Sequence, residues 1–101
     1  MQDIACTLSA TDLRDRRTAW LKVGRHVAAS EAMPGGLGLT FTAVPGLRES
    51  LAELVRLEAE CCAWMRFATA DAPEGIRLSI TAAGEDGERG VRESFAALTR
   101  G

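Results

Sequence analysis

The residues with the clearest chemical potential are two adjacent cysteines, Cys61 and Cys62, and a glutamate, Glu58, three and four positions before them. Side chains at these spacings lie next to one another on a helix. On a helical wheel with about 100° per residue, Glu58 falls in the middle of an apolar face. That face comprises Leu47, Leu51, Leu54, Cys61, Cys62 and Met65. A carboxylate on an apolar face needs a partner, so this stretch is where we expect a chemical site.

Glu58 has two candidate roles. Arg17, on an earlier predicted helix, could form a buried ion pair with it, which would make its role structural. Alternatively, Glu58 could act as a general acid or as a metal ligand. The two roles are compatible with each other, and the sequence does not separate them.

A third cysteine, Cys6, faces inward from a predicted strand over residues 3–8, where Ile4, Cys6 and Leu8 alternate with Ala5 and Thr7. If this strand is central in its sheet, Cys6, Cys61 and Cys62 could converge near Glu58. Thiolates select Cu(I), Zn(II) and similar soft metals, and such a site would also suit arsenite or Hg(II). Trp64 is close enough in sequence to form a wall of the site. The alternative is that the cysteines are core-filling hydrophobic residues.

Composition limits the classes of protein. The chain of 101 residues is long enough for one domain and is 47% hydrophobic and 26% charged, with a net charge of −2 and a single lysine, Lys22. This balance predicts no nucleic-acid partner. The chain has no leader pattern and no membrane-spanning run, so we expect a cytoplasmic protein. Adjacent cysteines close a small, strained ring when oxidised, so in that compartment Cys61 and Cys62 should both be thiols.

The positions of apolar residues predict the elements. A helix should span residues 10–25, and a hairpin should follow over 27–43, although its first arm could continue the helix. A second helix should run to about Trp64, followed by a second hairpin with arms 66–70 and 75–82. After a turn over 84–90, a last helix should bury Val91, Phe95 and Leu98. The order β-α-β-β-α-β-β-α predicts an α+β, ferredoxin-like variant with helices on one face of an antiparallel sheet. The other face could pack in a homodimer.

Three short motifs carry a resemblance to a known group. C-T-L leads into a helix that contains D-R-R, and E-x-E-C-C-A-W ends the second helix. In these motifs the chain resembles small, mostly uncharacterised bacterial proteins with an E-x-x-C-C sequence, some of which are associated with heavy-metal resistance. The resemblance implies that Cys6, Arg17, Glu58, Cys61 and Cys62 share a site.

Three hypotheses follow. The first is a cytoplasmic protein that binds a soft metal ion, a metalloid or a small thiophilic ligand through Cys6, Cys61 and Cys62, with Glu58 as a further ligand or proton carrier, for sequestration or detoxification. The second is a small thiol-dependent enzyme that cleaves metal–carbon bonds or performs thiol redox chemistry, with Glu58 as the catalytic acid. The third is a homodimeric interaction module with structural cysteines.

Overall fold

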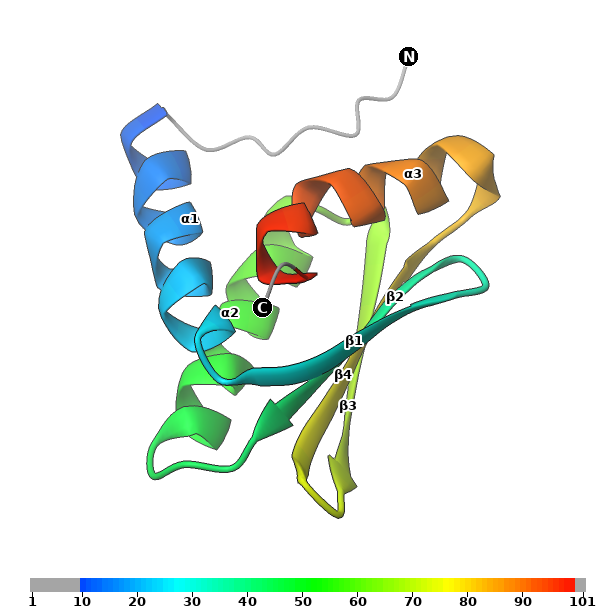
Figure 1. The fold of residues 1–101 in the computed structure, drawn as a ribbon. Coiled ribbons are helices and arrows are strands. Elements are labelled where there is room, and N and C mark those ends of the chain that lie inside the picture. The colour runs from blue at the N-terminus through cyan, green and yellow to red at the C-terminus, as the bar shows by residue number, and fades with distance from the viewer. Residues whose placement is uncertain (1–9, 100–101) are drawn as a thin grey trace.

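The computed structural model describes residues 10–99, without the side chains of residues 10–13, 61 and 99. The predicted strand over residues 3–8, with Cys6, therefore lies outside the described residues. Within them the chain forms three α-helices, four strands and a short 3₁₀ helix (Figure 1). In chain order these are α1 (Ala10–Gly24), β1 (Val27–Met33), β2 (Gly36–Thr42), α2 (Leu47–Cys61), β3 (Met65–Ala72), β4 (Gly75–Ala82), α3 (Gly84–Ser94) and η1 (Ala96–Thr99).

The four strands form one antiparallel sheet in the order β1-β2-β4-β3. Each hairpin supplies one edge strand and one central strand, and β2 pairs with β4 in the middle, where Leu39 lies opposite Leu78. The apolar side chains of these central strands alternate and are buried, as expected for strands with one face on a core, and in β2 the intervening Gly36 and Gly38 are buried as well. The buried apolar side chains are those of Leu37, Leu39, Phe41, Ile76, Leu78 and Ile80.

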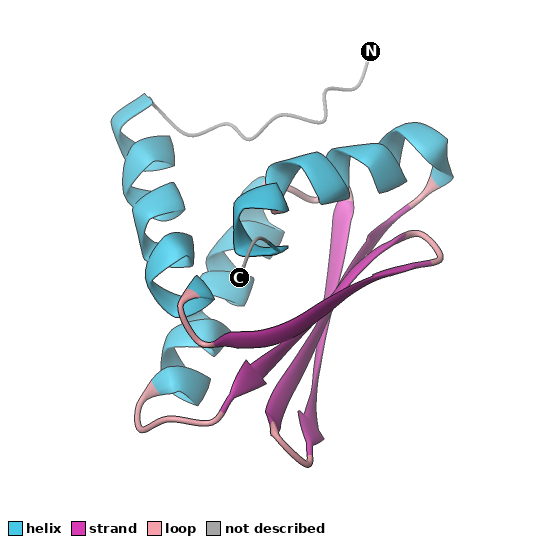
Figure 2. Cartoon of the chain, in the orientation of Figure 1, coloured by secondary structure: helices cyan, strands magenta, loops and turns pink. Residues whose placement is uncertain are grey.

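The helices lie on one side of this twisted sheet (Figure 2). Leu51 and Leu54 of α2, Trp20 and Val23 of α1, and Val91 of α3 are buried in the same core as the inward-facing strand residues. The predicted α+β fold, with helices on one face of an antiparallel sheet, is therefore confirmed for the described part of the chain. On the other face of the sheet, Thr40, Arg77, Ser79 and Thr81 are half-buried.

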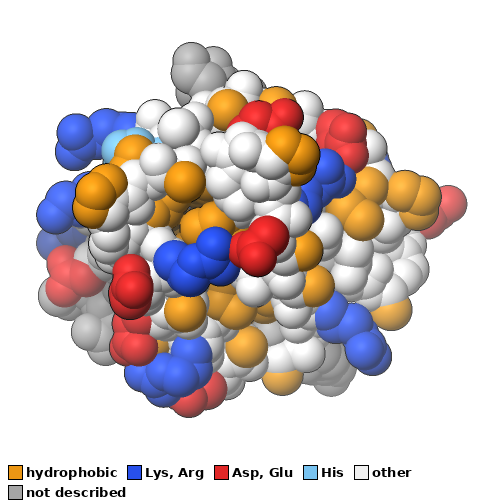
Figure 3. Space-filling model, turned by 90° about the horizontal axis from the view of Figure 1, so that it is seen from below, with side chains coloured by type: hydrophobic (Ala, Val, Ile, Leu, Met, Phe, Trp, Pro, Cys, Tyr) orange, Lys and Arg blue, Asp and Glu red, His pale blue; other side chains and the backbone are white. Residues whose placement is uncertain are grey.

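The outer face of the sheet carries small residues and one cross-strand ion pair. Arg77 of β4 reaches across β2 to Glu31 of β1. Its guanidinium lies over Gly38, where a Cβ would stand 2.5 Å from Arg77 Nη2. A side chain at position 38 would therefore displace the flexible end of Arg77. On the surface seen from below, positive and negative side chains lie close together among scattered hydrophobic ones (Figure 3).

The predicted first arm of the first hairpin is confirmed as strand β1. The boundaries of the elements differ from the prediction in two places. Helix α2 ends at Cys61, three residues before the predicted end, and a turn in which Met65 N–H donates to Cys62 O at 3.0 Å leads into β3. The stretch Gly84–Gly90, predicted to be a turn, is the first part of α3. None of the described helices is long and apolar enough to cross a membrane.

Candidate functional site

The buried face of α2 is the one that the sequence predicts. Leu47, Leu51 and Leu54 are buried, and Glu58 and Cys62 continue the same face toward the end of the helix. Glu58 is 8% exposed. Among the residues that the structure describes, it is the one charged residue that is buried. A buried carboxylate requires hydrogen-bond donors around it, so the contacts of Glu58 define the site.

One oxygen of the Glu58 carboxylate is held by two donors from α1. Trp20 Nε1 donates a hydrogen bond to Glu58 Oε1 at 2.8 Å, and Arg16 Nη1 approaches the same oxygen at 3.2 Å. The Arg16 and Glu58 side chains are only 15% and 11% exposed. Charge-assisted hydrogen bonds of this kind are stronger than neutral ones, so α1 fixes the position of the carboxylate.

The arginine that pairs with Glu58 is thus Arg16 and not the predicted Arg17. Arg16 lies four residues before Trp20 and shares its face of α1. Arg17 is rotated by about 100° from that face, and its side chain is exposed. Arg17 nevertheless lines the same pocket as Glu58, and the described residues include no hydrogen-bond or ion-pair partner for it. The sequence analysis missed both Arg16 and the Trp20 donor. The signal that could have found them is their spacing of four residues, which places both side chains on one face of the helix.

The second oxygen of Glu58 faces Cys62. Cys62 caps the C-terminal end of α2, where its backbone N–H donates to Glu58 O at 2.8 Å, and the residue is 3% exposed. Cys62 Sγ lies 3.4 Å from Glu58 Oε2. Cys62 is disulfide-bonded in this structure, so the sulfur carries no proton and this distance is a van der Waals contact. After reduction the thiol would have a carboxylate acceptor at that distance.

The disulfide differs from the sequence prediction that the cysteines are thiols. Cys6 and the side chain of Cys61 lie outside the described part of the structure, so the predicted convergence of three sulfurs stays a prediction. Within the described residues, no three His, Cys, Asp or Glu side chains form a group that could hold a metal ion.

A pocket of about 510 Å³ adjoins these residues. This volume is in the range of small-molecule sites. Its floor and walls come from α1, the end of α2 and the segment from α3 to η1. The lining residues include Arg16, Arg17, Trp20, Leu21, Glu58, Cys62, Trp64, Met65, Glu93, Phe95 and Leu98. The sequence expectation placed Trp64 beside the site, and Trp64 lies on the pocket wall. The contribution of η1 was not predicted.

Aromatic and glycine contacts hold the pocket walls together. Phe95 packs edge-on against Trp20, with ring centroids 5.1 Å apart, and edge-on against Phe67 at 6.4 Å. Such pairs add about 0.5–1.5 kcal/mol to the burial of the rings. Gly24 at the end of α1 allows Leu98 of η1 to approach, because a Cβ there would lie 2.4 Å from Leu98 Cδ2. The C-terminal segment is therefore fixed against α1 beside the pocket.

Comparison of this chain with protein-family models, with curated proteins and with solved structures gave no match. The fold and site define it as an α+β protein with an antiparallel sheet in which a disulfide-bonded cysteine lies beside a buried, hydrogen-bonded carboxylate.

Proposed function

We propose that this chain is a small thiol–disulfide exchange protein in which Cys62 alternates between disulfide and thiol and Glu58 carries the thiol proton. The observation that carries this proposal is the contact of 3.4 Å between Glu58 Oε2 and the sulfur of a disulfide-bonded cysteine. Thiol exchange requires a thiolate and therefore a route for the proton. A buried carboxylate in contact with the sulfur provides one.

The two carboxylate oxygens of Glu58 have different contacts and, in this proposal, different roles. Oε1 accepts from Trp20 and Arg16, which hold the carboxylate in place. Oε2 contacts Cys62 Sγ. A proton carrier must be within hydrogen-bond reach of the proton that it takes, and the fixed orientation keeps Oε2 at the sulfur. Trp20 and Arg16 are positioning residues in this scheme.

Oxidation of the reduced protein by a small disulfide would proceed in two exchanges. First, Cys62 gives its thiol proton to Glu58 and the thiolate attacks one substrate sulfur. The substrate S–S bond breaks, a mixed disulfide with Cys62 forms, and the released substrate thiolate takes a proton from solvent. The second protein thiol then loses its proton to solvent and attacks Cys62 Sγ, and the second substrate thiolate leaves with the proton from Glu58. Two electrons and two protons pass from the protein to the substrate.

This class of function is consistent with a cytoplasmic protein. Disulfides of mesophilic proteins in that compartment are usually transient, and they serve catalysis or redox sensing. The Cys62 disulfide lies at a pocket and beside a carboxylate. This position fits a disulfide that is reduced and re-formed during function better than one that only stabilises the fold. Cytoplasmic location remains part of the proposal.

Equilibration in glutathione redox buffers tests the proposal. The thiols would be trapped with iodoacetamide, and peptide mass mapping would identify whether Cys6 or Cys61 pairs with Cys62. The proposal expects a reduction potential above about −300 mV, the range of exchangeable disulfides, and loss of catalysed exchange in Cys62→Ser. A potential below that range, or full activity of Cys62→Ser, would reject it.

Soft-metal binding is a second candidate, favoured by one distance. An ion bound tetrahedrally, to a thiolate at about 2.3 Å and a carboxylate oxygen at about 2.0–2.2 Å, holds these two atoms about 3.5–3.7 Å apart. Cys62 Sγ and Glu58 Oε2 are 3.4 Å apart. In the reduced protein Cys6 and Cys61 would supply the further sulfur ligands, and the function would be heavy-metal or metalloid sequestration.

Titration of the reduced and the oxidised protein with Hg(II), Cu(I), Zn(II) and arsenite tests this candidate. It expects binding of one ion by the reduced protein, no binding by the oxidised protein, and weaker binding by Glu58→Gln. Binding that persists after Cys61 and Cys62 are both changed to serine would contradict it.

A further inference from the structure

We propose that the pocket beside Cys62 binds a low-molecular-weight thiol of the amino-acid or short-peptide type, which carries both a carboxylate and an ammonium group. This inference rests on the proposed exchange function and names its small substrate. It is drawn from the charges and the unused donors that line the pocket, none of which the exchange step itself employs.

Two opposite charges line the pocket in addition to the Arg16–Glu58 pair. Arg17 comes from α1 and Glu93 from the last turn of α3. Both side chains are exposed, and the described residues contain no ion pair or hydrogen bond that either side chain makes. An arginine is a good partner for a carboxylate, and a glutamate is a partner for an ammonium group. A ligand with both charges would use both residues.

A third group is the indole N–H of Trp64. Trp64 lines the same pocket, and its Nε1 is buried with no hydrogen-bond acceptor within the described part of the chain. A buried donor without an acceptor costs about 1–3 kcal/mol. A carboxylate or peptide oxygen of the ligand would supply the missing acceptor once the indole turns and brings Nε1 to the pocket surface.

The size of the pocket also favours a small ligand. Its volume of about 510 Å³ is sufficient for a molecule of one to three amino acids. Cys62 and Glu58 lie on the same lining surface as Arg17, Trp64 and Glu93. A thiol held by its charged groups would therefore present its sulfur within the pocket that contains the Cys62 sulfur.

The test uses four small disulfides chosen for the charged groups that they carry: cystine with both charges, the disulfide of 3-mercaptopropionate with carboxylates, cystamine with ammonium groups, and the uncharged disulfide of 2-mercaptoethanol. The rate at which each oxidises the reduced full-length protein would be divided by its rate with the urea-unfolded protein, which removes intrinsic reactivity. Arg17→Gln and Glu93→Gln are the test variants. Arg14→Gln and Glu85→Gln, exposed residues of α1 and α3 that do not line this pocket, are the matched controls.

The expected result is a normalised preference for cystine over the uncharged disulfide of about tenfold, with each charge contributing about threefold. Arg17→Gln should remove the preference for carboxylate, Glu93→Gln that for ammonium, and the controls should retain both. Equal normalised rates for all four disulfides, unchanged in the two test variants, would overturn this inference and leave the exchange function standing. Failure of every disulfide to oxidise Cys62 would reject the exchange function itself.

Discussion

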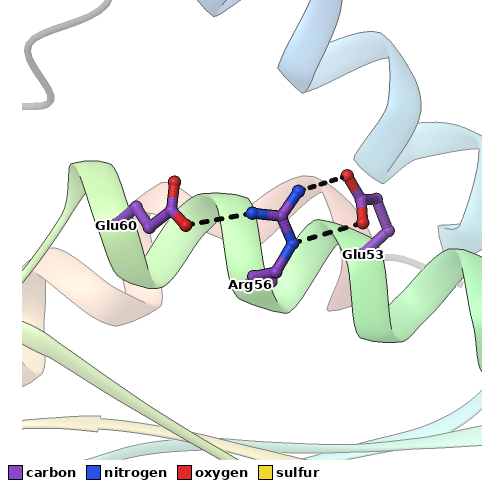
Figure 4. A network of polar contacts seen from close by, with 3 residues as sticks. All are labelled: Glu53, Arg56 and Glu60. Carbon is purple, nitrogen blue, oxygen red and sulfur yellow. Dashed lines mark hydrogen bonds and ion pairs between the residues drawn. The ribbon is translucent and has the colours of Figure 1, made fainter.

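The two faces of α2 each hold a glutamate that pairs with an arginine, and the surroundings of the two pairs differ. On the exposed face, Arg56 bridges Glu53 at 2.7 Å and Glu60 at 3.0 Å (Figure 4). On the buried face, Arg16 approaches Glu58 at a longer 3.2 Å. The side chains of the exposed Arg56–Glu53 pair are 55% and 57% exposed, whereas those of the buried pair are 15% and 11% exposed. Distance alone would rank the exposed pair first.

The comparison indicates that burial, rather than distance, decides which ion pair contributes more to stability. In water, a short ion pair gains little because solvent screens it and two long side chains are ordered. The Arg56 hydrogen bond holds the pKa of Glu53 below its usual value, and Glu53 raises the pKa of Arg56. Away from water, the same groups must be satisfied by protein donors. We therefore expect the longer contact at Glu58 to have the larger effect on stability.

Removal of the buried carboxylate should have the largest effect. Glu58→Ala takes the acceptor from Trp20 Nε1 and the counter-charge from Arg16 in a buried site. We expect a loss of about 3 kcal/mol in the free energy of unfolding, measured by urea denaturation of the oxidised protein. Glu53→Ala, on the exposed face of the same helix, is the matched control. Equal losses in the two variants would contradict the ranking of the faces.

Removal of the indole donor should have a smaller effect. Trp20→Phe keeps an aromatic ring against Phe95 but removes the hydrogen bond of 2.8 Å to Glu58. A hydrogen bond to a charged group contributes about 1.5–3 kcal/mol, so we expect a loss of about 2 kcal/mol. The double variant with Glu58→Ala should lose less than the sum of the single variants. Strict additivity would show that the two side chains are not coupled.

Breaking the exposed network should have almost no effect. Arg56→Gln removes both ion pairs of Figure 4. Because exposed pairs are screened by solvent, the thermal unfolding midpoint should stay within the error of the measurement. A clear drop in the midpoint at moderate salt would show that the exposed face contributes to stability.

The smallest effect should be a pH dependence on the exposed face. The folded pKa of Glu53 lies below its usual value, so its contribution is present above the usual pKa and is lost as pH falls through the lowered one. The small difference in unfolding free energy between the wild type and Glu53→Gln should therefore vanish in acid. A difference that grows as pH falls would have the wrong sign.

The sequence predicted those elements whose apolar residues repeat regularly. The alternation in β2 and β4 and the helical repeat of α2 specify one buried face each, so the sheet and the position of Glu58 were predicted correctly. The stretch Gly84–Gly90 was misassigned because glycine and charge are typical of turns. In the structure Gly87 is a packing residue, since a Cβ there would lie 2.9 Å from Ala82 Cβ, and such a close approach depends on tertiary contacts.

The candidate site was predicted only in part. Glu58 was found because a carboxylate interrupts an apolar face, but its partner was placed at Arg17 because a phase error of one residue rotates a helix position by about 100°. The Trp20 hydrogen bond and the wall formed by η1 come from contacts between residues far apart in the chain. No local pattern encodes those contacts.

The most direct test of the central claim is the rate at which the reduced protein is oxidised by cystine at pH 7 in the wild type and in Glu58→Gln. Trp20 and Trp64, the two tryptophans of the chain, both line the pocket beside Cys62, so stopped-flow fluorescence can follow the reaction. If Glu58 carries the thiol proton, Glu58→Gln should react at least about tenfold more slowly, while Glu53→Gln reacts like the wild type. An equal or faster rate in a folded Glu58→Gln protein would contradict the account.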